Sequence, residues 1–127
     1  MVLAAMMSAV SSVWIYLLVT EPLAWPNTTV VRGDAVETVR AMKASGGQDL
    51  HTMGSLSLCR SLLAAGLADR FRVVVFPVIT GRTGRDRIYD GYPDVALDLV
   101  EHRTFDGRLQ LLEYVPTVLP GADASHG

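Results

Sequence analysis

The segment from Asp49 to Gly66 places the strongest constraint on the fold, because it combines the patterns of a strand, a tight turn and a helix. Asp49 to Met53 is a short strand candidate, and Gly54-Ser55 interrupts it. Leucines then recur at near-helical intervals as far as Gly66, which is a natural C-terminal cap. A strand that passes directly into an amphipathic helix predicts an α/β domain.

The preceding residues show the same alternation of strand and helix patterns. Thr28 to Val31 is a short strand candidate, and Asp34 with Glu37 has the spacing of a capping box at a helix start. We expect this helix to end at Gly46-Gly47. Val13 to Tyr16 is rich in β-branched and aromatic residues and favours a buried strand.

The second half of the chain is dominated by strand patterns. Phe71 to Ile79 is a β-branched run, which predicts an interior strand buried on both faces, although Pro77 places its later part at a sheet edge or bulge. Gly81 to Pro93 has the composition of a long loop. Val95 to Phe105 and the residues after Asp106-Gly107 alternate apolar and polar side chains, which predicts a terminal antiparallel hairpin.

Composition excludes several classes of protein. The 127 residues suit one domain, and a formal net charge of -2 argues against an electrostatic nucleic-acid binder. One cysteine and three scattered histidines offer no metal-ligand spacing, so we expect no metal site. A single cysteine also makes a reducing cytoplasm the default location.

The uncharged stretch from Met1 to Thr20 raises the question of membrane insertion. A signal peptide carries a basic segment before its apolar run, and a spanning helix needs about 20 apolar residues. Neither pattern fits, because no Lys or Arg precedes the run and Ser8, Ser11 and Ser12 dilute it. These criteria argue against membrane association, and a membrane-tethered protein is the weakest of three hypotheses.

The start of the helix after Gly54-Ser55 is the best functional candidate. A helix N-terminus attracts phosphate through its backbone N–H groups and the positive end of its dipole. Gly54 would let the backbone approach such a ligand, and Ser55 and Ser57 add hydroxyl donors, although either serine could be a plain N-cap. Cys59 has no histidine nearby, so packing is a better interpretation than nucleophilic catalysis.

Several segments, taken in order, resemble a known family. They are Glu21 to Val30 with Gly33-Asp34, Asp49 to Ser55, Leu62 to Asp69, Phe76-Pro77-Val78 with Gly81, and Phe105-Asp106-Gly107 leading to Leu111-Leu112-Glu113-Tyr114. This pattern is similar to the dihydrofolate-reductase-like family, in the branch that contains the C-terminal reductase domain of the bifunctional riboflavin-biosynthesis protein.

The resemblance implies a fold, a cofactor and a substrate class. The fold is an α/β, dihydrofolate-reductase-like mixed sheet flanked by helices and ending in an antiparallel β-hairpin. It would span residues 13–117, after an N-terminal extension at 1–12 and before a flexible tail at 118–127. The implied cofactor is NADPH, and the implied substrate is pterin-like or a ribosylaminopyrimidine-like molecule. The cofactor-binding residues implied are Thr20, Gly54, Ser55, Leu56 and Ser57.

The chain also departs from the family pattern near its start. The usual opening strand and substrate-side helix have no recognisable counterpart, so no catalytic residue is assigned. Tyr16 to Val19 lacks the polar residues that hold the cofactor 2'-phosphate in the family, and Thr20 is the nearest hydroxyl. The alternative hypothesis is a truncated, non-catalytic ligand-binding or oligomerising domain. A sheet edge left unpaired predicts a homodimer.

Overall fold

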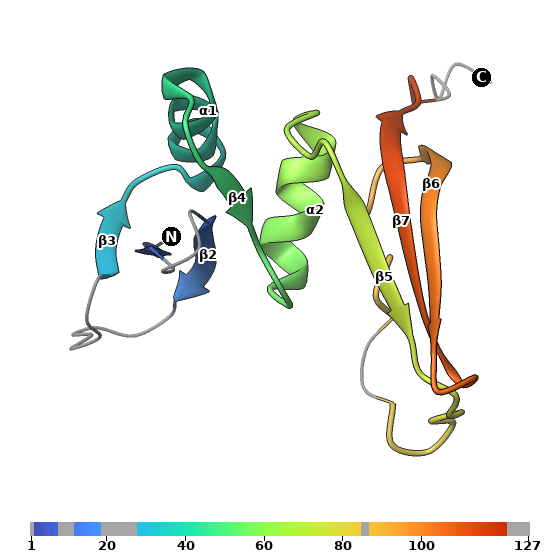
Figure 1. Cartoon of the computed structure of the whole chain (residues 1–127). Coiled ribbons are helices and arrows are strands. Elements are labelled where there is room, and N and C mark those ends of the chain that lie inside the picture. The colour runs from blue at the N-terminus through green and yellow to red at the C-terminus, as the bar shows by residue number, and fades with distance from the viewer. Residues whose placement is uncertain (1, 8–11, 19–27, 85–86, 122–127) are drawn as a thin grey trace. The chain divides into compact units, whose positions relative to one another are not determined.

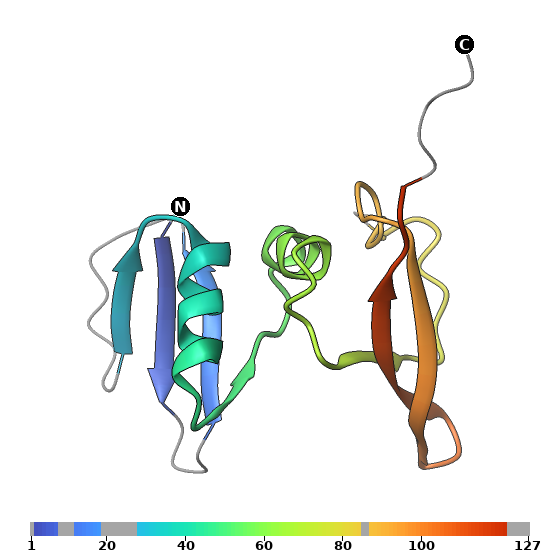
Figure 2. The same cartoon turned by 90° about the horizontal axis from the view of Figure 1, so that it is seen from above.

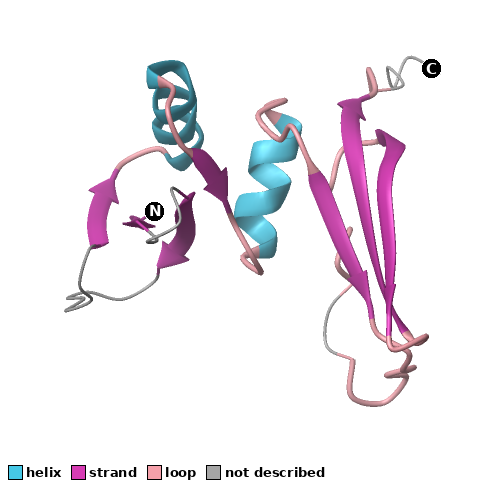
Figure 3. Cartoon of the chain, viewed as in Figure 1, coloured by secondary structure: helices cyan, strands magenta, loops and turns pink. Residues whose placement is uncertain are grey.

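The computed structural model describes residues 2–7, 12–18, 28–84 and 87–121 of the chain. Its Cα positions group into two compact units, Met1–Leu67 and Ala68–Gly127. The first unit contains both helices together with strands β1 to β4, whereas the second contains strands and loops (Figures 1 and 3).

The first unit contains a four-stranded sheet. Its strands are β1 (Val2–Met7), β2 (Ser12–Leu18), β3 (Thr28–Arg32) and β4 (Asp49–His51), in the order β3-β1-β2-β4. β1 runs antiparallel to both of its neighbours, whereas β2 and β4 run parallel. The sheet is therefore mixed.

Helix α1 (Ala35–Ser45) begins and ends where its sequence predicts. The backbone N–H of Glu37 donates to Asp34 Oδ1 at 2.9 Å, which satisfies one of the helix's first N–H groups. At the other end Gly46 takes a positive φ of 73° and its N–H donates to Lys43 O. Glycine adopts this conformation at little steric cost, so the helix stops there.

Helix α2 (Leu56–Ala64) ends in a Schellman motif. The N–H of Gly66 donates to Leu63 O, and that of Leu67 donates to Leu62 O. Gly66 has a φ of +68° and lies one residue beyond the cap residue Ala65. The predicted role of Gly66 in ending this helix is confirmed to within one position.

The core of the first unit lies between its sheet and its helices. Figure 2 shows α1 lying along one face of the sheet. Ile15 from β2 is 2% exposed and clusters with α1 and α2 side chains, including Leu58, which is fully buried. The other buried members of this cluster are Ala35, Val39 and Leu62. The predicted strand at Val13 to Tyr16 is confirmed, with Ile15 buried within it, and so are the apolar faces of both helices.

The second unit is a three-stranded antiparallel sheet. Its strands are β5 (Phe71–Val75), β6 (Val95–Phe105) and β7 (Leu109–Val118), in the order β5-β7-β6. β6 and β7 form the predicted hairpin, and its turn residues Asp106 and Gly107 have φ angles of 50° and 65°. Positive φ at both central positions suits the twist of a two-residue hairpin.

The structure corrects the prediction for Phe71 to Ile79. The strand ends at Val75, and it is an outer strand of its sheet instead of an interior one. Val74 and Val75 are 41% and 47% exposed, and Ile79 is 97% exposed beyond the strand. A β-branched run indicates strand propensity but does not decide which strands become neighbours.

The structure also shows one strand that the sequence analysis missed. Residues 1–12 are predicted as an extension. The strand β1 (Val2–Met7) lies within them and pairs with both β2 and β3. No helix in the described part of the chain is long and apolar enough to cross a membrane.

Candidate functional site

The turn between β4 and α2 has an unusual backbone. Gly54 has a φ of +70°, and Ser55, the N-cap of α2, is also left-handed at φ 44° and ψ 60°. A left-handed conformation costs a residue with a Cβ roughly 1–2 kcal/mol, so the surrounding structure must hold Ser55 in place. The Ser55 side chain does not do so, because it makes no capping hydrogen bond.

This backbone geometry is suited to an anion. A left-handed residue next to right-handed helical residues directs successive backbone N–H groups toward one side, where the helix dipole is also positive. The predicted residues Gly54, Ser55, Leu56 and Ser57 all lie at this end of α2. Gly54 and Ser57 are exposed, Leu56 is 42% exposed, and a Cβ added to Gly54 would meet no atom within 4 Å.

Cys59, which lies near the start of α2, makes two hydrogen bonds to the Gly54-Ser55 turn. Its backbone N–H donates to Ser55 O at 3.0 Å, and its thiol donates to Gly54 O at 3.2 Å. One residue thus engages the carbonyls of both left-handed residues. Sequence reasoning assigned Cys59 to packing alone, because no sequence pattern signals a contact from a thiol to a carbonyl five residues earlier.

The environment of the Cys59 thiol favours its protonated form. Burial raises the pKa of the Cys59 thiol, and the neighbouring Thr52 hydroxyl opposes this shift in part. Thr52 Oγ1 is itself buried and, among the described residues, makes no well-aligned hydrogen bond. The thiol therefore keeps its proton at neutral pH and can act as a donor.

The remaining predicted cofactor residue is Thr20, which lies outside the described residues, as does Val19. The structure therefore brings together four of the five predicted residues at the start of α2. Within the described ranges, no group of three or more His, Cys, Asp or Glu side chains could hold a metal ion.

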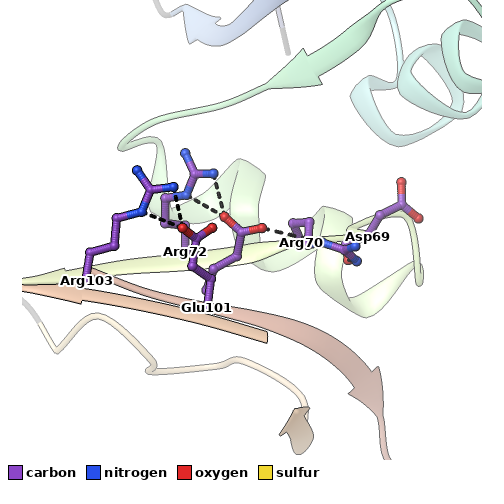
Figure 4. Close-up of polar contacts among 6 residues, drawn as sticks. Asp69, Arg70, Arg72, Glu101 and Arg103 are labelled. Atoms are coloured by element: carbon purple, nitrogen blue, oxygen red, sulfur yellow. Dashed lines mark hydrogen bonds and ion pairs between the residues drawn. The ribbon is translucent and has the colours of Figure 1, made fainter. Parts of the chain in front are cut away.

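A second polar cluster lies on the sheet of the second unit (Figure 4). Glu113 is 9% exposed; it accepts a hydrogen bond from Arg72 Nε at 2.9 Å and forms an ion pair with Arg70 at 3.5 Å. Glu101 lies opposite Glu113 in the register of β6 and β7, and it pairs with Arg103. The arginines offset the repulsion between the two facing carboxylates.

This cluster was not predicted from the sequence, although the sequence pattern indicates one of its contacts, the one between β6 and β7. The hairpin centred on Asp106-Gly107 indicates which residues of β6 and β7 face each other. The partner of Glu113 on β5 follows only from the pairing of β5 with β7, and 41 residues separate Arg72 from Glu113.

Comparison with known proteins places the chain in a family. The family model "RibD C-terminal domain" matches residues 10–111, which is most of the chain. The chain belongs to the RibD C-terminal domain family. This match confirms the resemblance to the reductase branch of the dihydrofolate-reductase-like proteins.

Two individual proteins illustrate the similarity of this RibD C-terminal domain to known chains. It is 29% identical over 84 residues to YyaP, an uncharacterised protein of Bacillus subtilis (strain 168). The match covers 66% of this chain and 44% of YyaP, so the chain spans less than half the length of that relative.

The second protein is a pyrimidine reductase-like protein from Corynebacterium diphtheriae with a solved structure. It superposes with a TM-score of 0.53 at 20% identity, over 64% of this chain and 34% of the other. This likeness confirms the predicted α/β, dihydrofolate-reductase-like fold.

Proposed function

We propose that this RibD C-terminal domain is an NADPH-dependent reductase domain in which the start of α2 binds a phosphate group of the cofactor. The observation that carries the proposal is the left-handed Gly54-Ser55 turn, which leads into the positive end of the α2 dipole. Family membership supports the cofactor class, since RibD C-terminal domains typically bind a nicotinamide cofactor.

The residues at this turn fit a phosphate group. Gly54 supplies backbone without a side chain, and no atom lies within 4 Å of where its Cβ would stand. We assign the contacts to Gly54, Ser55, Leu56 and Ser57, with Thr20 as a further hydroxyl for the 2'-phosphate. When bound, NADPH supplies the hydride, while these residues bind and orient its phosphates. The substrate class we propose is a pyrimidine-like or pterin-like small molecule.

The test is a titration of NADPH, followed by fluorescence, with two matched glycine variants. Gly54→Ala and Gly66→Ala both place a Cβ on a residue with φ near +70° where no atom lies within 4 Å. Both should therefore lower the free energy of unfolding by about 1 kcal/mol. Only Gly54→Ala should weaken NADPH binding, by about fivefold or more, because only Gly54 lies at the proposed phosphate site.

Two outcomes would contradict the proposal. If the wild-type chain shows no saturable binding at millimolar NADPH, the non-catalytic domain becomes the better hypothesis. If the two alanine variants bind NADPH equally well, the cofactor does not use the Gly54-Ser55 turn.

We also propose that the chain is a cytoplasmic homodimer. β5 and β6 are the outer strands of the second sheet, and β6 is the longer, with 11 residues against 5 in β5. An outer strand presents backbone groups that can pair with a second chain. Leu97 and Leu99 of β6 are 42% and 53% exposed, which adds apolar surface along this strand.

A further inference from the structure

The Gly54-Ser55 turn needs an internal support, because two successive residues adopt positive φ and the second of them carries a side chain. The first turn of α2 supplies that support from Cys59. Its thiol donates a hydrogen bond to Gly54 O at 3.2 Å, and its backbone N–H donates one to Ser55 O at 3.0 Å.

The thiol contact decides which way the peptide between Gly54 and Ser55 points. In a planar trans peptide the carbonyl and the following N–H point in opposite directions. Since Gly54 O points toward Cys59 Sγ, the N–H of Ser55 points away from it. If this peptide rotated, an acceptor oxygen would take the place of a donor on that side of the turn.

We propose that Cys59 is a positioning residue that sets the Ser55 N–H toward the cofactor phosphate through its thiol contact with Gly54 O. The role of the phosphate rests on the function proposed above, whereas the contact itself does not. Loss of the thiol would remove the donor and leave the peptide free to rotate. Cofactor affinity would then fall.

The experiment compares three variants of the full chain. Cys59→Ala removes the donor, and Cys59→Ser keeps a donor on a shorter side chain. Ser61→Ala is the matched control, because Ser61 Oγ donates to Ser57 O at 3.0 Å on the same helix but does not reach the turn. Circular dichroism on thermal unfolding checks that each variant folds.

Two measurements decide the outcome. Cys59→Ala should raise the Kd for NADPH by about fivefold, as expected for one lost hydrogen bond, with partial rescue in Cys59→Ser and no change in Ser61→Ala. In ligand-free protein, the NMR amide resonances of Gly54 and Ser55 should move in Cys59→Ala and stay in place in Ser61→Ala.

The two measurements separate failure of this proposal from failure of the proposed function. If wild-type protein does not bind NADPH, the proposed function fails, and the amide resonances alone then decide whether Cys59 holds the turn. Unchanged Gly54 and Ser55 resonances in Cys59→Ala would overturn the contact. A Kd for Cys59→Ala equal to that of wild type would overturn its effect on the cofactor.

Discussion

Among single residues, Thr52 has a side-chain hydroxyl whose burial should affect the free energy of unfolding. Its oxygen is buried and makes no well-aligned hydrogen bond within the described ranges. A buried polar group without a partner costs about 1–3 kcal/mol of desolvation. We therefore expect Thr52→Val, which replaces the hydroxyl with a methyl group of similar size, to raise the free energy of unfolding by about 1 kcal/mol.

Chemical denaturation of Thr52→Val and Thr38→Val makes this a paired measurement. Thr38 Oγ1 donates to Asp34 O at 2.8 Å, so the same change at Thr38 should lower stability by about 1 kcal/mol. A loss of stability in both variants would show that the Thr52 hydroxyl has an effective partner, for which the neighbouring Cys59 thiol is a candidate.

At the scale of elements, the start of α1 depends on the Asp34 carboxylate. Its Oδ1 accepts the N–H of Glu37 at 2.9 Å and so caps the first turn of the helix. Asp34→Ala should lower the free energy of unfolding by about 1 kcal/mol, whereas Asp34→Asn keeps an acceptor and should cost much less. Urea denaturation of both variants measures this, and equal losses would contradict a capping role.

The β5-β7-β6 sheet depends on Glu113 more than on Glu101. The Glu113 side chain is 11% exposed and held by two arginines, whereas the Glu101 side chain is 39% exposed and pairs with Arg103. Glu113→Leu should therefore cost about 2 kcal/mol, since it removes charge-assisted hydrogen bonds. Glu101→Leu should change stability by less than about 0.5 kcal/mol, because an exposed ion pair contributes little.

Thermal unfolding of the two leucine variants gives the comparison. Either variant removes the repulsion between these two facing carboxylates, so that effect is common to both and does not separate them. A larger loss in Glu101→Leu than in Glu113→Leu would mean that burial does not control the strength of these pairs.

At the scale of the whole molecule, the prediction concerns assembly. Light scattering should give the mass of a dimer at micromolar concentration. The double variant Leu97→Lys with Leu99→Lys should shift this mass toward that of the monomer, because charge on an outer strand disfavours pairing. Ile79→Lys is the control, since Ile79 is 97% exposed and lies outside the strands. Dissociation by Ile79→Lys alone would place the interface on the loop after β5, and a wild-type monomer would refute the dimer.

Local sequence patterns were sufficient for most elements of the fold. Asp34 and Gly46 predict the limits of α1, Gly66 predicts the end of α2, and Asp106-Gly107 predicts the hairpin. Each feature acts through neighbours within a few residues, by satisfying nearby N–H or carbonyl groups or by permitting a positive φ. The resemblance to the reductase branch likewise rests on segments visible in the sequence, and the family match confirms it.

The candidate site was predictable in its position but not in its internal support. A Gly-Ser turn leading into α2 follows from the local sequence pattern. The folded structure was needed to show that Ser55 is left-handed and that the Cys59 thiol contacts Gly54 O. It also decided that β1 joins the first sheet, that β5 is an outer strand, and that Arg72 reaches Glu113. These contacts depend on strand order, on packing and on the rotamers of individual side chains, which neither periodicity nor turn residues specify.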